Sequence, residues 1–235
     1  MIKTKKFHST VTILCITLSV LSTNSYAQQT EHKHHNPSHS SHEVFNDKEA
    51  VTKMSKNFES AERDSMQQPH KVIKYLGNIK GKKIMDIGAA TGYFSIKFAT
   101  KGALVIAADV SDGFQAYLKD RIEKEKINNI ELRKIPFDSP SLKEKEVDIV
   151  FIANTYHHIE NRSEYFAKVK KGLKSNGELI VLDFFKVEFT DKVQAPAMGM
   201  RTSVDEVVFE LKKAGFTSFE VEISLLPYQY IINAK

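Results

Sequence analysis

The 235-residue sequence contains a single cysteine, Cys15, which lies near the N-terminus. The chain beyond residue 27 therefore has neither disulfides nor a thiol nucleophile, and thiol-dependent chemistry is excluded. The longest apolar stretch of the N-terminal segment, residues 11–21, is too short to span a bilayer, which needs roughly 20 residues. No block of lysine and arginine stands out on a predicted helix face, so composition gives no case for nucleic-acid binding.

The first 27 residues predict a secretory signal peptide. Lys3, Lys5 and Lys6 form a positive region, residues 11–21 form an apolar core, and residues 25–27 place small side chains before a cleavage site at Gln28. We therefore expect a periplasmic or secreted protein without stable membrane insertion after cleavage; an uncleaved segment would still leave the domain outside. The three lysines belong to 34 basic residues, so residues 28–235 hold 31 basic against 29 acidic residues.

Residues 28–43 form a polar segment with five histidines, and we predict a disordered tail. Its imidazoles are able to bind Zn²⁺ or Cu²⁺ loosely, but their spacing matches no closed metal site, and a solvated linker is the simpler interpretation. We assign no metal ligands. Residues 44–71 predict an N-terminal helical extension in which residues 63–69 form a loop, and residues 72–235 predict the main domain.

The residues around position 88 predict the centre of the domain. Residues 84–87 form an apolar strand, Gly88 to Gly92 a tight turn, and Tyr93 begins a helical pattern. Glycine adopts a positive φ without penalty and lets a ligand approach the backbone closely. This strand, turn and helix are typical of the first crossover in a parallel sheet.

An acid follows at the predicted end of the second strand. Residues 103–108 are apolar and lead into Asp109, whose carboxylate is able to accept both hydroxyls of a ribose. This pattern predicts a nucleoside site, although dinucleotide-binding proteins also place an acid about 20 residues on. Their G-x-G-x-x-G motif is absent, because Ala90 stands between Gly88 and Gly92. A tight turn without a ligand is the remaining alternative.

The rest of the chain alternates between strand and helix patterns. Further strands are predicted at 130–135, 147–153 and 178–183, with a turn at Asn176-Gly177 before the last. Asn161 with Glu164, and Ser203 with Glu206, have the spacing of capping boxes. Residues 216–223 and 228–232 predict an antiparallel pair at the sheet edge. The fold class is therefore α/β, with a doubly wound, mostly parallel sheet.

Together these features resemble class I S-adenosylmethionine (SAM) methyltransferases, whose sheet has seven strands and an antiparallel C-terminal hairpin. The resemblance covers about residues 72–234 and rests on Asp86-x-Gly88-x-x-x-Gly92, Asp109, Val147-Asp148 entering Asn154, residues 173–178 and Ala214-Gly215-Phe216. Residues 63–69 and 155–158 also look like a bacterial exported subgroup. Ala90, Met66 and Ser175-Asn176 depart from the pattern, and Ala90 is the departure expected to crowd the cofactor.

The resemblance implies SAM as cofactor and a set of roles. Asp86 orients the turn or holds the amino group of the cofactor through water, Gly88 and Gly92 admit the methionine part, and Asp109 binds the ribose. The remaining expected cofactor residues are Ala90, Val110, Phe137, Asp138 and Asn154, of which Phe137 and Asp138 flank the adenine. The candidate catalytic residues follow the fourth strand and supply a base for an acceptor that carries a proton: Tyr156, His157 and His158.

The function expected is SAM-dependent methyl transfer to a small-molecule acceptor, whose pocket residues 184–202 help to shape. The alternative is an exported, non-enzymatic nucleoside- or metal-binding module on the same scaffold, because SAM is made in the cytosol and fold does not fix function. A nicotinamide oxidoreductase is a third interpretation, disfavoured by the missing glycine pattern.

Overall fold

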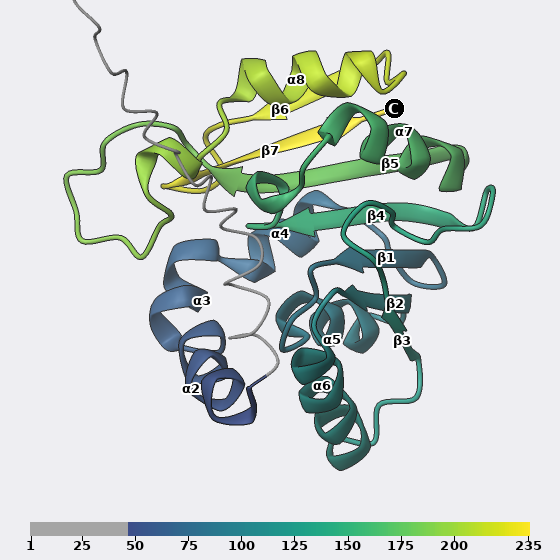
Figure 1. Ribbon diagram of the computed structural model, residues 1–235, viewed down its shortest axis with the longest axis vertical. Helices are drawn as coiled ribbons and strands as arrows, with labels where there is room; N and C mark the ends of the chain where they lie inside the picture. The colour runs from purple at the N-terminus through teal and green to yellow at the C-terminus, as the bar shows by residue number, and fades with distance from the viewer. Residues whose placement is uncertain (1–46) are drawn as a thin grey trace, which may run out of the picture. The chain divides into compact units, whose positions relative to one another are not determined.

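The computed structural model describes residues 47–235, which form one seven-stranded sheet with helices on both faces (Figure 1). The expected signal peptide, residues 1–27, and the His-rich tail, residues 28–43, lie outside the described residues and stay predictions. Within residues 47–235, no helix has the length and apolar character that crossing a membrane would take.

The sheet has the strand order β3-β2-β1-β4-β5-β7-β6. Strands β1 to β5 run parallel, whereas β7 is antiparallel to both β5 and β6. This confirms the predicted fold class and the C-terminal pair at the sheet edge. The strands are β1 (Lys83–Ile87), β2 (Leu104–Asp109), β3 (Ile130–Lys134), β4 (Val147–Ala153), β5 (Leu173–Phe184), β6 (Phe219–Glu222) and β7 (Gln229–Ala234).

Helices α4 and α5 pack on one face of the sheet with α6 beside α5, and α7 and α8 cover the other face. The central strands are mostly apolar because both of their faces are buried. On β1, for example, Ile84 and Met85 point to opposite faces, and neither is exposed. The helices are α2 (Lys48–Phe58), α3 (Ala61–Gln67), α4 (Pro69–Tyr75), α5 (Tyr93–Thr100), α6 (Asp112–Lys124), α7 (Arg162–Gly172) and α8 (Val204–Lys213), with 3₁₀ turns η1 (Tyr156–His158) and η2 (Met198–Met200).

The N-terminal extension differs from the expected loop at residues 63–69. Helix α3 continues to Gln67, with Ser60 capping it by accepting a hydrogen bond from the backbone N of Arg63 at 3.2 Å. Gln68 then turns with φ 43°, and Pro69 begins α4 at the position where its missing N–H costs nothing. The expected loop is thus a single residue between two short helices.

Two other local predictions have opposite outcomes. The capping box of α8 is confirmed, since the backbone N of Ser203 donates to the Glu206 carboxylate at 2.8 Å. The capping box predicted at Asn161 is wrong, because Asn161 has φ 46° and its side chain makes no capping hydrogen bond.

The turn predicted at Asn176-Gly177 lies inside β5. There the pairing of β5 with β4 jumps from Val147–Leu173 to Ile149–Glu178 and leaves a bulge.

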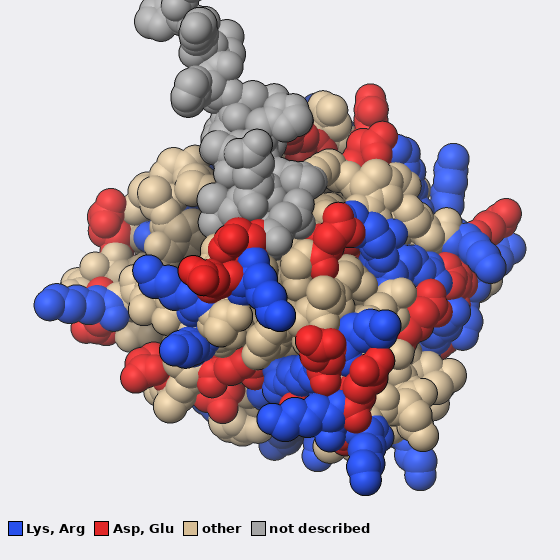
Figure 2. Space-filling view, turned by 60° about the horizontal axis from the view of Figure 1, so that its bottom comes forward, with Lys and Arg blue, Asp and Glu red and all other residues tan. Residues whose placement is uncertain are grey.

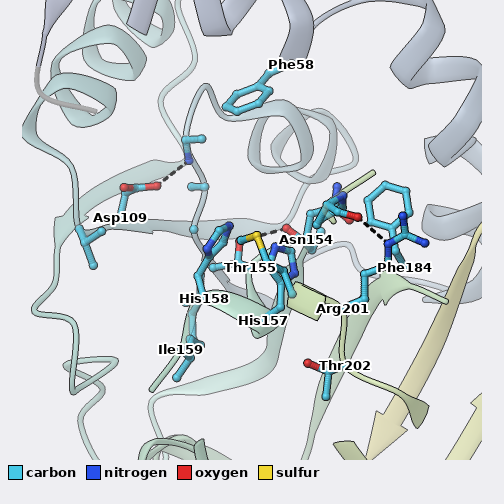
Figure 3. A pocket seen from close by; sticks show the side chains of 18 of the residues that line it. Phe58, Asp109, Asn154, Thr155, His157, His158, Ile159, Phe184, Arg201 and Thr202 are labelled. Atoms are coloured by element: carbon cyan, nitrogen blue, oxygen red, sulfur yellow. Dashed lines mark hydrogen bonds between the residues drawn. The ribbon is translucent and has the colours of Figure 1, made fainter. Parts of the chain in front are cut away.

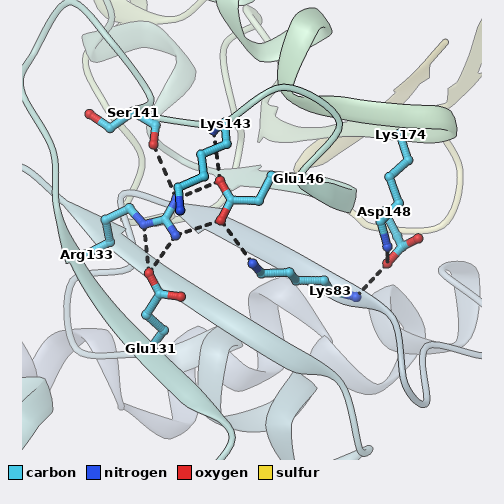
Figure 4. Close-up of polar contacts among 8 residues, drawn as sticks. All are labelled: Lys83, Glu131, Arg133, Ser141, Lys143, Glu146, Asp148 and Lys174. Carbon is cyan, nitrogen blue, oxygen red and sulfur yellow. Dashed lines mark hydrogen bonds and ion pairs between the residues drawn. The ribbon is translucent and has the colours of Figure 1, made fainter.

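A cluster of ion pairs holds the connection between β3 and β4, which contains no helix (Figure 4). The Arg133 guanidinium contacts Glu146 at 2.8 Å and Glu131 at 2.6 Å, and the Lys83 ammonium lies 3.0 Å from Glu146. Hydrogen bonds from Arg133 hold the pKa of the Glu146 carboxyl well below its usual range. This cluster joins β1, β3 and the start of β4, and none of its residues lines the pocket described next.

Candidate functional site

A large pocket of about 2550 Å³ opens at the carboxyl ends of the parallel strands. Its lining includes Gly88 after β1, Asp109 at the end of β2, Asn154 after β4 and Phe184 at the end of β5 (Figure 3). The strand order reverses between β1 and β4, which is where open α/β sheets bind ligands. The volume exceeds the 300–1,000 Å³ range typical of one small-molecule site, so the pocket has room for two ligands.

Asp109 lies at the bottom of this pocket. Its Oδ2 accepts a hydrogen bond from the backbone N of Ala90 at 2.8 Å, and its Oδ1 accepts one from the backbone N of Ser111 at 2.8 Å. A carboxylate has about four acceptor sites, so Asp109 keeps acceptor capacity for a ligand beyond these backbone bonds. Burial raises the pKa of the Asp109 carboxyl, and the N–H groups of Ser111 and Ala90 oppose this rise. The acid is only 6 % exposed, so it belongs to the core as well as to the pocket.

The turn after β1 has a left-handed backbone at three positions. Gly88, Ala90 and Gly92 have φ of 74°, 47° and 81°, respectively. Ala90 thus adopts the left-handed conformation and points its N–H at Asp109, although its methyl group makes that conformation costly by about 1–2 kcal/mol. The departure from the family glycine therefore preserves the turn.

The two glycines serve packing between elements more than ligand approach. A Cβ on Gly88 would lie 2.3 Å from Thr155 Oγ1, and one on Gly92 would lie 2.4 Å from Leu118 Cδ1 on α6. Gly92 is not among the residues that line the pocket, and its expected role beside the methionine part stays a prediction. Gly88 and Ala90 do line it.

Apolar side chains flank Asp109 on the helical side of the pocket. Phe58 of α2 stacks on Phe114 of α6 with ring centroids 5.9 Å apart, and both line the pocket together with Val110. Phe137 also lines it and is 53 % exposed, with Asp138 beside it. The structure thus brings three expected cofactor residues, Val110, Phe137 and Asp138, into the pocket that Asp109 lines. Sequence patterns did not single out Phe58 or Phe114 as pocket residues.

The N-terminal extension is fixed to the turn that carries these groups. Glu59 accepts a hydrogen bond from Thr91 Oγ1 at 2.5 Å and contacts Arg121 at 2.6 Å. Arg63 lies 4.1 Å from the centroid of the Tyr93 ring. Helices α2 and α3 therefore form one wall of the pocket and hold the turn between β1 and α5.

Asp86 lies outside the pocket lining. It is 3 % exposed, and its Oδ2 accepts a hydrogen bond from Ser95 Oγ of α5 at 2.6 Å. Burial raises the pKa of the Asp86 carboxyl to about 6. The expected role in orienting the turn agrees with this link to α5, and the alternative role, contact with the amino group of the cofactor through water, stays a prediction.

Asn154 lines the pocket directly after β4. Its φ is 55°, and its Oδ1 accepts a hydrogen bond from Gln229 Nε2 of β7 at 2.5 Å. That bond leaves the Asn154 side-chain NH₂ as a donor. This donor suits an anionic or carbonyl group of a ligand.

His157 and His158 both line the pocket, with ring centroids 4.2 Å apart. The His157 side chain is 2 % exposed, and its Nδ1 lies 3.0 Å from Oδ2 and 3.2 Å from Oδ1 of Asp183. Desolvation and the neighbouring His157 ring lower the pKa of His158 to about 4. Asp183 was not among the expected site residues; its position at the end of a predicted strand, like that of Asp109, was the available signal.

Tyr156 does not face the pocket. It is fully buried, stacks on Phe166 with centroids 4.9 Å apart, and donates a hydrogen bond to Glu210 at 2.7 Å. Burial raises the pKa of its phenol. The structure therefore removes Tyr156 from the catalytic candidates and assigns it to packing between η1, α7 and α8.

Residues 185–202 form the wall opposite α2 and α3. Arg201 closes this segment by donating to the carbonyl oxygens of Pro196 at 2.6 Å and Val187 at 2.7 Å. Phe189 packs against Tyr228 with centroids 5.3 Å apart. Several residues of the segment line the pocket, among them Val193, Pro196 and Met200, as the sequence predicted. Within residues 47–235, no group of three or more His, Cys, Asp or Glu side chains is placed to hold a metal ion.

Comparisons with known proteins agree with this geometry. A family model described as "Methyltransferase domain" matches residues 85–181. The crystal structure of a SAM-dependent methyltransferase from Aquifex aeolicus is similar with a TM-score of 0.70 and 23 % identity, over 80 % of this chain and 97 % of that one. A Haemonchus contortus phosphoethanolamine N-methyltransferase 2 in complex with SAM gives a TM-score of 0.58 and 21 % identity, over 67 % of this chain and 38 % of that one.

The curated relatives match this chain over a shorter part of its length. The ubiquinone biosynthesis O-methyltransferase of Acinetobacter baylyi is 24 % identical over 46 % of each chain, and the demethylmenaquinone methyltransferase of Tropheryma whipplei is 27 % identical over 47 % of this chain and 45 % of its own. The chain thus spans less than half the length of these two relatives. By its strand order and its structural neighbours, the chain has the class I methyltransferase fold, and its residues 85–181 resemble a methyltransferase domain.

Proposed function

We propose that this protein is a SAM-dependent methyltransferase that acts on a small molecule. The observation that carries the proposal is Asp109, a carboxylate at the end of β2 that lines the pocket together with aromatic side chains and keeps acceptor capacity for a ligand. The family match and the solved neighbours named as SAM-dependent methyltransferases support it. The non-enzymatic alternative has no comparable support.

The residues present fit a nucleoside cofactor. Asp109 would accept the ribose hydroxyls, Phe58, Phe114 and Phe137 would enclose the base, and Asn154 would donate to the amino-acid part. Ala90 stays compatible because its N–H turns toward Asp109. Bound SAM would supply a methyl group already activated on a sulfonium. The protein then has to position an acceptor, exclude water and remove a proton where the acceptor carries one.

A small-molecule acceptor suits the concave pocket and the surface charge. On the face in Figure 2, acidic and basic side chains are interspersed without a broad area of one sign. Nucleic-acid binding would call for a basic stripe. The name of one curated relative, an O-methyltransferase, is compatible with a small acceptor but leaves its identity open. Export to the periplasm or beyond remains part of the proposal and depends on residues 1–27.

Calorimetric titration with SAM and S-adenosylhomocysteine tests the proposal. Charged hydrogen bonds are worth about 1.5–3 kcal/mol each, so Asp109→Ala should weaken SAM binding roughly tenfold to a few hundredfold. Asp120→Ala, an exposed acid on α6, is the matched control and should bind like the wild type. No wild-type binding at millimolar SAM would reject the enzyme and favour an exported binding module.

Asp109→Ala should also destabilise the fold, because Asp109 is buried; the same substitution at an exposed acid at the end of a strand would change stability little. The backbone N–H groups of Ala90 and Ser111 would lose their acceptor, at a cost of about 1–3 kcal/mol for a buried donor. Binding should therefore be measured at a temperature where circular dichroism shows the variant folded.

A further inference from the structure

The His157–Asp183 pair is a feature that cofactor binding does not explain. Asp183 is fully buried at the end of β5, and within residues 47–235 its carboxylate contacts the His157 ring and the backbone N of Phe184, at 2.8 Å, with no lysine or arginine in ion-pair range. Burying a carboxylate is costly unless it is paired. This carboxylate is therefore placed for the imidazole.

The pair fixes the histidine tautomer. An ionised carboxylate only accepts hydrogen bonds, so the Nδ1 of His157 carries the proton and Nε2 carries the lone pair. Nε2 has no hydrogen-bond partner among the described residues, and His157 lines the pocket. Asp183 thus holds the His157 imidazole in one orientation, with Nδ1 bound to a buried carboxylate and Nε2 left to act as a base.

We propose that Asp183 positions His157 as the base for an acceptor whose reacting atom is a phenolic oxygen. This inference rests on the proposed function and names its acceptor class. The phenolic oxygen bonds to the methyl carbon while the sulfur–methyl bond breaks and leaves its electron pair on sulfur, giving S-adenosylhomocysteine. The hydroxyl proton passes to Nε2 of His157 and then to solvent. Asp183 stabilises the imidazolium that forms.

The chemistry of the base selects the acceptor. A neutral amine attacks through its own lone pair, and a thiol ionises near pKa 8.5 without much help. A hydroxyl with the acidity of water, near 15.7, is too far from an imidazole to be deprotonated efficiently, whereas a phenol, near 10, lies within reach. A His–Asp pair therefore contributes most to a phenol.

The wall next to His157 suits a flat, apolar molecule. Phe184 follows Asp183 directly, and its ring centroid lies 6.5 Å from that of Phe189. The Phe189 ring packs edge-on against Tyr228. Phe184, Tyr228 and Met200 line the pocket, and Asp191 fixes the Tyr228 hydroxyl at 2.9 Å. Aromatic and thioether side chains provide contacts for an aromatic ring.

The first experiment uses the wild-type protein. Calorimetry establishes SAM binding, and ¹⁵N NMR of the imidazoles, assigned with His157→Gln, reports which nitrogen of His157 is protonated. We expect the Nδ1–H tautomer at neutral pH. Absence of SAM binding would reject the proposed function, whereas an Nε2–H tautomer would overturn the positioning role alone.

Asp183→Asn then tests the positioning role. Because the backbone N of Phe184 already donates to the Asp183 carboxylate, the Asn oxygen should stay there and its NH₂ should face His157 Nδ1. The proton should move to Nε2, and kcat should fall by about 10²–10⁴-fold with SAM affinity unchanged. Asp148→Asn is the matched control. Asp148 lies outside the pocket and accepts hydrogen bonds from the backbone N of Lys83 and from the Lys174 ammonium. Full turnover or an unchanged tautomer in Asp183→Asn would overturn the role.

The acceptor class is tested by S-adenosylhomocysteine release with matched aromatic probes: a phenol, a benzyl alcohol, an aniline and a thiophenol, each with the same ring substituents. We expect release with the phenol and at least tenfold less with the others. SAM binding without phenol methylation, or a preference for the aniline or thiophenol, would overturn the phenolic class while leaving the methyltransferase proposal intact.

Discussion

Asp86 and Asp109 are buried carboxyls on adjacent strands that have different surroundings. Asp109 accepts two backbone N–H groups and opens to the pocket, whereas Asp86 has Ser95 as its hydrogen-bond donor and lies away from the pocket. Burial raises the pKa of both, to about 6 for Asp86, and the charge of Arg63 opposes that rise. Asp86 is therefore a group whose ionisation opposes folding near neutral pH.

Asp86→Asn should remove one part of the pH dependence of stability. A carboxyl with a folded pKa of about 6 and an unfolded pKa near 3.9 is preferred protonated in the folded state. Ionisation of Asp86 lowers the free energy of unfolding. This loss is absent below pH 4, grows between pH 4 and 6, and reaches about 3 kcal/mol above pH 6. Urea denaturation of wild type and variant between pH 4.5 and 7.5 should show the variant gaining relative stability as pH rises. Parallel curves would contradict the buried titration.

The sequence anticipated several pocket residues because each follows an apolar strand. Asp109, Asn154 and His157 were predicted in this way, and the structure brings them to one pocket. Asp183 was missed because its partner is 26 residues away and only the pairing of β4 with β5 brings them together. The prediction of Tyr156 as a catalytic residue was wrong, because consecutive residues of a 3₁₀ turn point in different directions. Spacing alone does not say which of them faces the core.

At the scale of elements, the turn between β1 and α5 depends on how closely α6 approaches it. Gly92 begins α5 with φ 81°, and Leu118 of α6, which is fully buried, occupies the space that a side chain would need. The glycine spacing that the sequence displays therefore records helix packing as much as ligand binding. A sequence pattern cannot separate these two causes.

Gly92→Ala should destabilise the protein by about 2–4 kcal/mol, from the left-handed backbone and from overpacking against Leu118. Leu118→Ala alone should cost about 2–5 kcal/mol as a cavity. The double variant should be more stable than the sum predicts, by about 1–3 kcal/mol, since the smaller side chain removes the clash. Chemical denaturation of all four proteins gives this coupling, and strict additivity would show that the contact is relaxed elsewhere.

Element boundaries were predictable where burial was simple. The strand over residues 147–153 has its predicted bounds because both faces are covered and every apolar residue counts toward it. The second half of α3 was predicted as a loop because its contacts are polar: Arg63 stacks on Tyr93, Asp64 accepts from the Tyr93 hydroxyl, and Gln67 is fully buried. Apolar periodicity has no signal for a helix fixed in this way.

At the scale of the whole molecule, the first 27 residues predict the destination of the protein. The positive region, the short apolar core and the small residues before Gln28 predict cleavage. Intact-mass measurement on protein from the native host should give a chain beginning at Gln28. A cytosolic product that retains Met1 would contradict export, and it would leave the proposed activity unaffected.

The position of β7 has a consequence for synthesis of the chain. It lies between β5 and β6, both of which precede it in sequence, and it pairs with residues 179–184 of β5. Until residues 229–234 have left the ribosome, that buried, apolar strand keeps an open edge with unpaired backbone groups. The sheet therefore closes only after translation of its last strand, and for an exported chain that interval is when a chaperone has a strand edge to hold.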